Sequence, residues 1–329
     1  IRREDVFQVC VVGNTCMHHL FLGISPASLV HAPYTPAVSE RLVLNAGDYG
    51  LAVQERAELI MLSDIAGYVG ADTCGCLLAI RQDQQEEISL MIDIGTNGEM
   101  VLGNRERMVT CSTAAGPAFE GAKIECGMRG AAGAVDHVKY EDGKWNYTTV
   151  GNKPAVGLCG SGLIDLVAGL LDAGMLDENG VLRSGQEKQG VFILVLPERG
   201  GNERGVYLTQ KDLGEVQLAK AAIAAGIQML MERLGITEDD ICSVYIAGAF
   251  GNYMDPVSAG KIGLFPATLV KKVKPVGNAA GEGAKIALVN EKEMLEMDEL
   301  VRKIEFVELA ASADFQDHFI DELGFETGE

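Results

Sequence analysis

The sequence predicts an α/β protein with two lobes, in which mixed sheets are flanked by helices and a cleft separates the lobes. Three observations support this class. The chain has 329 residues, which is too long for a minimal domain and suits two linked α/β units. Apolar strand-like runs are repeatedly followed by a glycine-rich turn and then a helical pattern. Two segments also resemble each other weakly, which indicates a duplicated fold.

Composition narrows the range of functions. Apolar residues make up 47% of the chain and charged residues 22%, so the chain can bury a large core and disorder is not expected. The formal charge is −20, from 27 basic and 47 acidic residues, which argues against nucleic acid or an anionic membrane as the main partner. No uncharged apolar run reaches the roughly 18 residues of a membrane span, and the opening residues are no signal peptide. We therefore expect a cytoplasmic protein.

The cysteines form no metal-binding pattern. Only Cys74 and Cys76 are close together, and the single residue between them suits neither a zinc knuckle nor a ferredoxin cluster loop. The five histidines show no metal spacing either. We expect buried, reduced thiols at Cys10, Cys16, Cys74, Cys76, Cys111, Cys126, Cys159 and Cys242.

Local patterns predict the elements in chain order. A strand over residues 9–12 leads into a helical pattern over 17–23. A strand over 88–94 breaks at a turn and resumes over 99–102, and the Asn97-Gly98 pair between the two runs is a strong hairpin signal. A long helix with apolar residues at three-and-four spacing follows Asp212, over residues 214–235. A strand over 244–246 then opens into a small-residue loop.

The weak internal repeat pairs residues 9–29 with residues 244–266. Each segment contains a strand, a glycine turn, a short helix and a proline, and each is followed by a helix that opens in Gly and Ala, over residues 65–79 and 277–289. A repeat of this kind indicates two related α/β units with a cleft between them.

The sharpest motif is the run from Asp93 to Glu99, Asp-Ile-Gly-Thr-Asn-Gly-Glu. The strand delivers Asp93 at its end, and the small residues after it can point several N–H groups into one concavity, which suits phosphate oxygens. A carboxylate beside such a nest can hold Mg²⁺ through water or orient an attacking water. An ordinary hairpin with an Asn-Gly turn is the structural alternative.

Two further motifs are weaker by themselves. Gly116-Pro117 predicts a turn into a helix that begins near Glu120, whose carboxylate could lie near a ribose or a metal-bound water, or could simply favour the helix N-terminus. The small residues from Ala247 to Asn252 follow a buried strand and would let a flat ring lie against the main chain, although a tight connection has the same pattern. The glycines over residues 157–162 precede a helix, and we interpret them as close helix packing.

The order of these blocks resembles the second half of the acetate and sugar kinase, heat-shock chaperone and actin superfamily. There the hairpin is the second phosphate loop, and a ribose-side loop, an adenosine loop and a second connecting helix follow it. The sequence resembles the ATP-dependent reductive activators of corrinoid proteins from about residue 5 to about residue 320. The segments that carry this resemblance are VVGNTCMHHL, IAGYVGADT, DIGTNGEMVLG, STAAGPAFEGA, GLCGSGLIDL, IAGAFGNYMDP and VGNAAGEGA.

The resemblance implies a duplicated actin-like (RNase H-like) ATPase fold and a function. Such activators use ATP to drive an electron from a [2Fe-2S] ferredoxin-type domain to an inactive Co(II) corrinoid on a partner protein, which restores Co(I) for anaerobic methyl transfer. The implied cofactors are ATP and Mg²⁺, and the implied partners are a corrinoid protein and a second copy of the chain.

The resemblance also implies site residues. Asp93 and Glu120 would be catalytic, and Asp93 would hold Mg²⁺ through water. Phosphate, ribose and adenine would meet Gly95, Thr96, Asn97, Gly98, Gly116, Gly248, Ala249, Phe250, Gly251 and Asn252.

Two departures from the family pattern set the expected boundaries. The chain lacks the cysteine cluster of an iron–sulfur domain, and no second Asp-x-Gly-Thr-Thr hairpin precedes residue 93. We expect residues 1–86 to be the remainder of a first actin-like lobe and residues 87–329 to be the second lobe, with an inserted subdomain around 116–212. The chain by itself is then expected to bind nucleotide weakly and to hydrolyse it poorly.

Two other functions fit the same fold. One is an activator of a 2-hydroxyacyl-CoA dehydratase or a hydantoinase-like ATPase. The other is a non-catalytic module that docks the corrinoid protein or dimerises.

Overall fold

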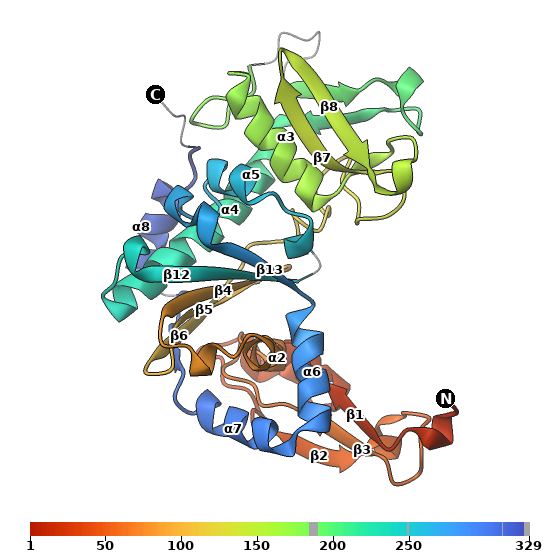
Figure 1. Ribbon diagram of the computed structural model, residues 1–329, viewed down its shortest axis with the longest axis vertical. Helices are drawn as coiled ribbons and strands as arrows, with labels where there is room; N and C mark the ends of the chain where they lie inside the picture. Colours follow the sequence, from red (N-terminus) through yellow and green to blue (C-terminus); the bar gives the residue numbers. More distant parts are fainter. Residues whose placement is uncertain (184–189, 249, 311, 326–329) are drawn as a thin grey trace.

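The described part of the chain folds around three mixed sheets and a two-stranded antiparallel ribbon, flanked by helices, which confirms the predicted α/β class. The structure is a computed structural model that describes residues 1–183, 190–248, 250–310 and 312–325. A three-stranded sheet lies at one end, a six-stranded sheet lies in the middle, and a third group of strands lies at the other end (Figure 1). We call these parts the N-terminal lobe, the central lobe and the outer unit.

The N-terminal lobe contains the sheet β1-β3-β2, made of β1 (Gln8–Val11), β2 (Leu42–Asn45) and β3 (Glu58–Met61). β1 and β3 are parallel, and β2 is antiparallel to β3. Helix α1 (Thr15–Phe21) follows β1, and its first turn is capped by the side chain of Asn14. Helix α2 (Ala71–Ile80) follows β3 and leads into the central lobe.

The central sheet has the order β13-β12-β4-β5-β6-β14. Its members are β4 (Ile88–Ile94), β5 (Gly98–Gly103), β6 (Met108–Thr113), β12 (Ile241–Ala247), β13 (Val273–Gly277) and β14 (Glu305–Phe306). β4, β5 and β6 form two successive antiparallel hairpins, and the first of them has the turn that Asn97-Gly98 predicts. β12 runs parallel to β4. Alternate β4 side chains face opposite sides of the sheet, with Leu90 in one apolar cluster and Met91 in another. Both faces are apolar because helices cover both of them.

Helices pack on both sides of the central sheet. Helix α4 (Gln210–Leu234) covers one face, where Ile223 contacts the hairpin at Gly98. On the other face α2 crosses α6 (Ala279–Val289) (Figure 1). The remaining helices are α5 (Pro256–Lys261), α7 (Glu291–Val301) and α8 (Ala313–Asp321).

The outer unit holds the sheet β8-β7-β9, a two-stranded ribbon and helix α3 (Gly160–Asp172). Its strands are β7 (Ala134–Glu141), β8 (Lys144–Thr149), β9 (Gly157–Leu158), β10 (Val191–Val195) and β11 (Val206–Thr209). A Cβ at Gly162 would lie 2.2 Å from the carbonyl oxygen of Val135, so this glycine allows α3 to approach β7 closely. This contact confirms the packing interpretation of the glycines over residues 157–162.

Short 3-10 turns connect these elements. They are η1 (Arg3–Asp5), η2 (Pro26–Leu29), η3 (Ala46–Tyr49), η4 (Gln82–Gln84), η5 (Val150–Asn152), η6 (Pro197–Arg199), η7 (Glu238–Asp240), η8 (Phe250–Asn252) and η9 (Ala267–Lys272).

The internal repeat is visible in the topology. In the N-terminal lobe the order is β1, α1, η2, β2, η3, β3 and α2, and β1 pairs with β3 in parallel. In the central lobe the order is β12, η8, α5, η9, β13 and α6, and β12 pairs with β13 in parallel. Apart from β2 and η3 in the first unit and η8 in the second, the two orders correspond. The two halves therefore present two equivalent helices, α2 and α6, and these are the helices that cross.

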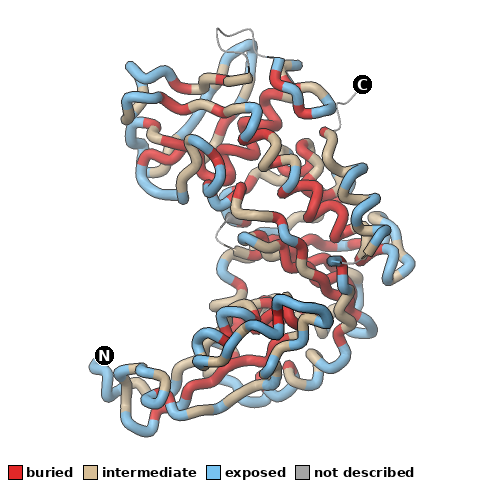
Figure 2. Tube along the Cα trace, turned by 180° about the vertical axis from the view of Figure 1, so that it is seen from behind, coloured by how far each residue is buried: buried red, intermediate tan, exposed pale blue. Residues whose placement is uncertain are grey.

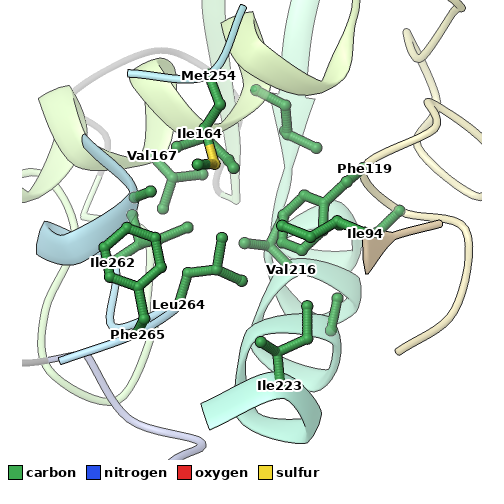
Figure 3. Packing of buried hydrophobic residues seen from close by; sticks show 14 of the residues in the cluster. Ile94, Phe119, Ile164, Val167, Val216, Ile223, Met254, Ile262, Leu264 and Phe265 are labelled. Atoms are coloured by element: carbon green, nitrogen blue, oxygen red, sulfur yellow. The ribbon is translucent and has the colours of Figure 1, made fainter. Parts of the chain in front are cut away.

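The buried core is continuous through the central lobe and the outer unit, and Figure 2 shows a smaller buried strip in the N-terminal lobe. In the main cluster Ile94, at the end of β4, packs near Phe119, and Val216 and Ile223 of α4 lie beside them (Figure 3). The loop that carries Phe119 is thus anchored next to the Asp93 hairpin by apolar packing.

Three expectations need correction. The long helix begins at Gln210, two residues before Asp212, because Thr209 and Asp212 form a capping box. No helix follows Gly116-Pro117, where the chain makes turns instead, because Gly121 takes a positive φ of 79° and packs against the backbone of Met128. Four of the eight thiols are not buried as expected, because Cys16 and Cys242 are exposed and Cys10 and Cys126 are half-buried, although all eight are free of disulfides.

None of the helices in the described part of the chain combines the length and the apolar character that crossing a membrane requires.

Candidate functional site

Two of the predicted loops meet at one edge of the central sheet. β4 and β12 are parallel neighbours, and Ala247 is in register with Asp93. A Cβ at Gly248 would lie 3.1 Å from Oδ1 of Asp93, so the turn after β12 touches the carboxylate at the end of β4. The carboxyl ends of parallel strands are a common place for ligands in α/β sheets.

The hairpin after Asp93 forms a compact turn. The Gly95 N–H donates to the Asn97 carbonyl at 2.9 Å, and the Gly116 N–H donates to the Thr96 carbonyl at 2.8 Å. Thr96 is exposed at the tip of the turn, and Asn97 is half-buried. Gly98 differs from these residues, because the space beside it is filled by Thr113 and Ile223, and it lies against α4. The structure therefore groups Gly95, Thr96 and Asn97 at the tip and places Gly98 in the packed base.

Glu120 comes to this turn from the loop that Phe119 anchors. Its Oε1 accepts a hydrogen bond from the Thr96 hydroxyl at 2.8 Å, and a Cβ at Gly95 would lie 3.8 Å from the same oxygen. Gly116, with a positive φ of 78°, has no atom within 4 Å of the place where a Cβ would stand. The loop that carries Glu120 therefore lies beside the Asp93 hairpin, and there is open space at Gly116.

The loop after β12 lies on the other side of Asp93. The Gly248 N–H donates to the Gly277 carbonyl at 2.9 Å, and a Cβ at Gly277 would lie 3.0 Å from Nδ2 of Asn252. A Cβ at Gly251 would lie 2.7 Å from the carbonyl oxygen of Ile246, so this glycine allows the turn to fold back on β12. Ala249 lies outside the described residues, and of Phe250 only its place at the start of η8 is described.

Helix α2 brings residues to the site that the sequence motifs did not indicate. The Cys76 thiol donates to Oδ2 of Asp93 at 3.7 Å. Asp72 lies four residues before Cys76, on the same face of the helix. Its negative charge raises the pKa of Cys76 and of Glu99. The sequence alone could have indicated Asp72 only as an acidic residue in the first turn of a Gly/Ala-rich helix, in the block GADT.

The carboxylates of Asp72, Asp93 and Glu99 ionise less readily than usual at this edge of the sheet. Burial raises the pKa of Asp93, and the Cys76 hydrogen bond opposes that rise. Burial raises the pKa of Asp72 to about 6 and that of Glu99 to about 8, and the negative charge of Asp93 adds to both. Of the ion pairs in the described part of the chain, none involves these three groups. A cation would relieve their repulsion.

The charges of Asp72 and Asp93 act on Glu99, and the charge of Asp93 acts on Asp72. No group of three or more His, Cys, Asp or Glu side chains among the described residues is arranged to hold a metal ion directly, so these carboxylates fit a cation that is held through water. The open position at Gly116 leaves room for a phosphate oxygen to approach the backbone.

The same edge lies close to the crossing of α2 and α6. A Cβ at Gly283 would lie 1.9 Å from the Gly75 carbonyl oxygen, and a Cβ at Gly75 would lie 2.6 Å from the Ala280 carbonyl oxygen. Gly75 lies between Asp72 and Cys76 in the sequence, so one helix both crosses its counterpart and carries residues to the carboxylate cluster.

Comparison with known proteins gives consistent matches along the whole chain. Residues 87–329 match a family model described as the C-terminal domain of RACo, the ASKHA domain, and residues 1–85 match the RACo middle region. ASKHA is the acetate and sugar kinase, heat-shock chaperone and actin superfamily. A solved structure named "reductive activator for corrinoid, iron-sulfur protein" superposes with a TM-score of 0.92 at 37% identity, over 99% of this chain and 53% of that one.

Two relatives have assigned functions. One is "corrinoid activation enzyme RamQ" from Eubacterium limosum, 35% identical over 97% of this chain and 56% of that protein. The other is "[Co(II) methylated amine-specific corrinoid protein] reductase" from Methanosarcina barkeri, 29% identical over 85% of this chain and 54% of that protein. The chain therefore spans about half the length of the relatives that it matches.

Proposed function

This chain belongs to the RACo family, and from that premise we propose that it is the ATP-hydrolysing module of a reductive activator of a corrinoid protein. The activator would use ATP to drive one electron onto Co(II) of the corrinoid, which gives the Co(I) form that accepts a methyl group. One observation carries the proposal: the turns after Asp93 and after Ala247 meet at the ends of β4 and β12. The names of the relatives support the corrinoid substrate.

We assign the phosphates to the hairpin tip and the nucleoside to the loop after β12. The N–H groups of the turn at Gly95, Thr96 and Asn97 would donate to phosphate oxygens, and Gly98 would hold the turn against α4. The open backbone at Gly116 would let the ligand approach, and Glu120, held by the Thr96 hydroxyl, would lie near the ribose. The loop from Gly248 to Asn252, with Ala249 and Phe250, would border the adenine.

We propose that Asp93 orients the attacking water and holds Mg²⁺ through water, with Asp72 and Glu99 beside it. Mg²⁺ would supply positive charge to the phosphate oxygens and to this carboxylate cluster. Because burial raises the pKa of all three carboxyls, the cluster would take up the cation and lose protons together. Glu120 would be a second catalytic carboxylate, and it would approach the same site from the loop beside the hairpin.

ATP would act through lobe closure. A nucleotide that touches both α2 and the loop after β12 favours the lobe arrangement in which those elements lie together, and only such a difference in affinity can shift a conformational equilibrium. The closed and open arrangements would differ in how they hold the corrinoid protein. The crossing of α2 and α6 is where the two lobes would pivot.

Several finer assignments belong to the same proposal. The electron would come from a [2Fe-2S] domain outside this chain, the activator would be a cytoplasmic homodimer, and neither nucleic acid nor a membrane would be its partner. Residues 1–86 would complete a first actin-like lobe, and the second lobe would span 87–329 with its insertion around 116–212. The relatives' names do not favour a dehydratase activator or a hydantoinase-like ATPase.

The proposal is tested with Asp93→Ala in the whole native polypeptide. We expect ATP hydrolysis and ATP-dependent reduction of the corrinoid to fall by about 100-fold or more, because the variant removes the carboxylate next to the phosphates. ATP turnover is measured by phosphate release, and corrinoid reduction by the absorbance change from Co(II) to Co(I).

The control is Asp239→Ala, which removes an exposed carboxylate in η7 and should leave both rates unchanged. If Asp93→Ala keeps ATP-dependent activation, the hairpin is not catalytic, and a docking or dimerisation module becomes the better description.

A further inference from the structure

We propose that His18 and Asp64, a buried pair in the N-terminal lobe, position the start of helix α2 and thereby the carboxylate of Asp72 for ATP hydrolysis. The inference rests on the proposed function and adds two positioning residues that neither the motifs nor the comparisons assign. They act through Asp72 and do not touch the nucleotide.

The pair joins three elements at one point. His18 lies on α1, Asp64 follows β3, and Nδ1 of His18 is 2.6 Å from Oδ2 of Asp64. Both side chains are almost completely buried, at 2% and 0% exposure. The other Asp64 oxygen, Oδ1, accepts the N–H of Ala71, the first residue of α2, at 2.9 Å. One carboxylate therefore links α1 to the beginning of α2.

The beginning of α2 is held by other contacts to α1. The Asp72 N–H donates to the Gly13 carbonyl at 3.3 Å. A Cβ at Gly70 would lie 2.5 Å from Cα of Asn14, so the two helix starts are in direct backbone contact. The Thr15 hydroxyl also donates to the Ala66 carbonyl at 2.7 Å. The first N–H groups of a helix have no acceptor within the helix, and here the N-terminal lobe supplies one to each of the first two.

This anchoring determines where Asp72 lies. Asp72 is adjacent to Ala71, and Cys76, one turn further along α2, reaches Asp93. A helix of this length behaves as a rigid rod, so fixing its first residue and one side chain a turn later fixes the carboxylate between them. Losing the anchor would let Asp72 move relative to Asp93 while the hairpin and the adenosine loop stay in place.

A purely structural role for the pair predicts something different. A buried pair of polar side chains contributes little net stability relative to apolar residues of similar volume, whereas removal of one partner leaves the other buried without it and is costly. Replacing both partners together therefore separates the two roles, because the fold survives but the acceptor for the Ala71 N–H is lost.

The test uses the double variant His18→Phe/Asp64→Leu in the whole native polypeptide. The control is His137→Phe/Asp165→Leu, which replaces another His–Asp pair, 3.1 Å apart, in the outer unit, where Asp165 is buried and His137 is 44% exposed. Four quantities are measured: kcat for ATP hydrolysis, KM for ATP, the exchange rate of the Ala71 amide without nucleotide, and the midpoint of thermal unfolding.

We expect both double variants to unfold cooperatively, and only the first to lose kcat, by about 10- to 100-fold, with KM for ATP changed by less than about threefold. The Ala71 amide should exchange faster in that variant alone. A folded His18→Phe/Asp64→Leu protein with wild-type kcat would overturn the inference, whatever the exchange rate of the Ala71 amide.

If that double variant does not fold, Ala71→Pro removes the same N–H from the helix side, because proline is tolerated at the first helical position. It should show the same loss of kcat at unchanged KM, and normal kcat rejects the inference. Asp93→Ala separates this failure from failure of the proposed function. If Asp93→Ala keeps ATP turnover, the ATP site itself is wrong, whereas normal kcat in the His18 and Asp64 variants alone rejects only the positioning role.

Discussion

At the scale of single residues, Glu99 shows how burial and neighbouring charge act together. Its side chain is 8% exposed, and its pKa rises to about 8 chiefly through burial, with the charges of Asp72 and Asp93 adding to the rise. The native state therefore holds a proton on Glu99 at pH values where the unfolded chain has lost it. Between the ordinary pKa of 4.5 and about 8, this group makes the native state less stable as the pH rises.

Glu99→Gln should remove this pH dependence, because glutamine is neutral throughout the range. The variant should gain stability over the wild type as the pH rises from near 5 to near 8, by on the order of 3 kcal/mol without divalent cations. Urea unfolding at the two pH values measures this difference.

Glu106→Gln is the control for Glu99→Gln, because Glu106 is exposed and its replacement should change stability equally at both pH values. A stability difference for Glu99→Gln that stays constant with pH would show that the carboxyl ionises normally in the native state. Added Mg²⁺ should stabilise the wild type more than Glu99→Gln, since the proposed site would bind the cation through the ionised carboxylates.

At the scale of elements, α2 and α6 are in close backbone contact, and glycines make this contact possible. Backbone atoms of Gly75 fill the space beside Gly283, so the helix axes can approach more closely than side chains would allow. The contact matters because α2 also carries Asp72 and Cys76 to the carboxylates.

Gly283→Ala should destabilise the protein by about 1–3 kcal/mol, because its Cβ would collide with the Gly75 carbonyl and force the helices apart. ATP turnover should fall as well, since α2 moves with the crossing. Thermal unfolding and phosphate release measure the two effects.

The matched variant is Gly214→Ala in α4, where no atom lies within 4 Å of the new Cβ. Alanine favours the helix by about 1 kcal/mol, so this variant should be stabilised rather than destabilised. Equal effects of the two substitutions would mean that the α2–α6 contact does not depend on close approach.

At the scale of the whole molecule, helix α7, late in the sequence, packs back against the N-terminal lobe. Helix α7 follows α6, and its Asp298 accepts from Arg41 and from the Ser63 hydroxyl, both at 2.8 Å. Glu293 of the same helix contacts Arg81 at the end of α2. The N-terminal lobe is thus connected to the central lobe both by α2 and by the α6–α7 segment, and motion between the lobes must involve both.

The chain by itself should bind ATP with a dissociation constant weaker than about 1 μM, whereas the whole native polypeptide should bind more tightly. The reason is that actin-like sites hold the phosphates between two hairpins, and residues 1–86 contain no counterpart of the Asp93 hairpin. Titration calorimetry with both proteins tests this expectation, and sub-micromolar binding by the chain alone would contradict it.

Much of the fold could be predicted because local chemistry determines it. The Asn97-Gly98 pair and the alternating apolar residues around it specify the β4–β5 hairpin, and the two similar segments specify two similar units. The corrinoid-activator family and the actin-like superfamily were also evident from the order of short blocks. Each of these features depends on neighbours along the chain, and residue types record such neighbours directly.

The composition of the site depended on tertiary structure. Asp72 lies 21 positions before Asp93, and no pattern in the sequence showed that α2 would turn this face to the end of β4. The turn at Gly121 was likewise set by its contact with the backbone of Met128, whereas the start of α4 at Gln210 is set by the local capping box of Thr209 and Asp212. Long-range packing selects among conformations that local preferences leave close in free energy, so the sequence determined the elements and the family, and the packing of α2 against β4 and α6 decided which carboxylates share a site.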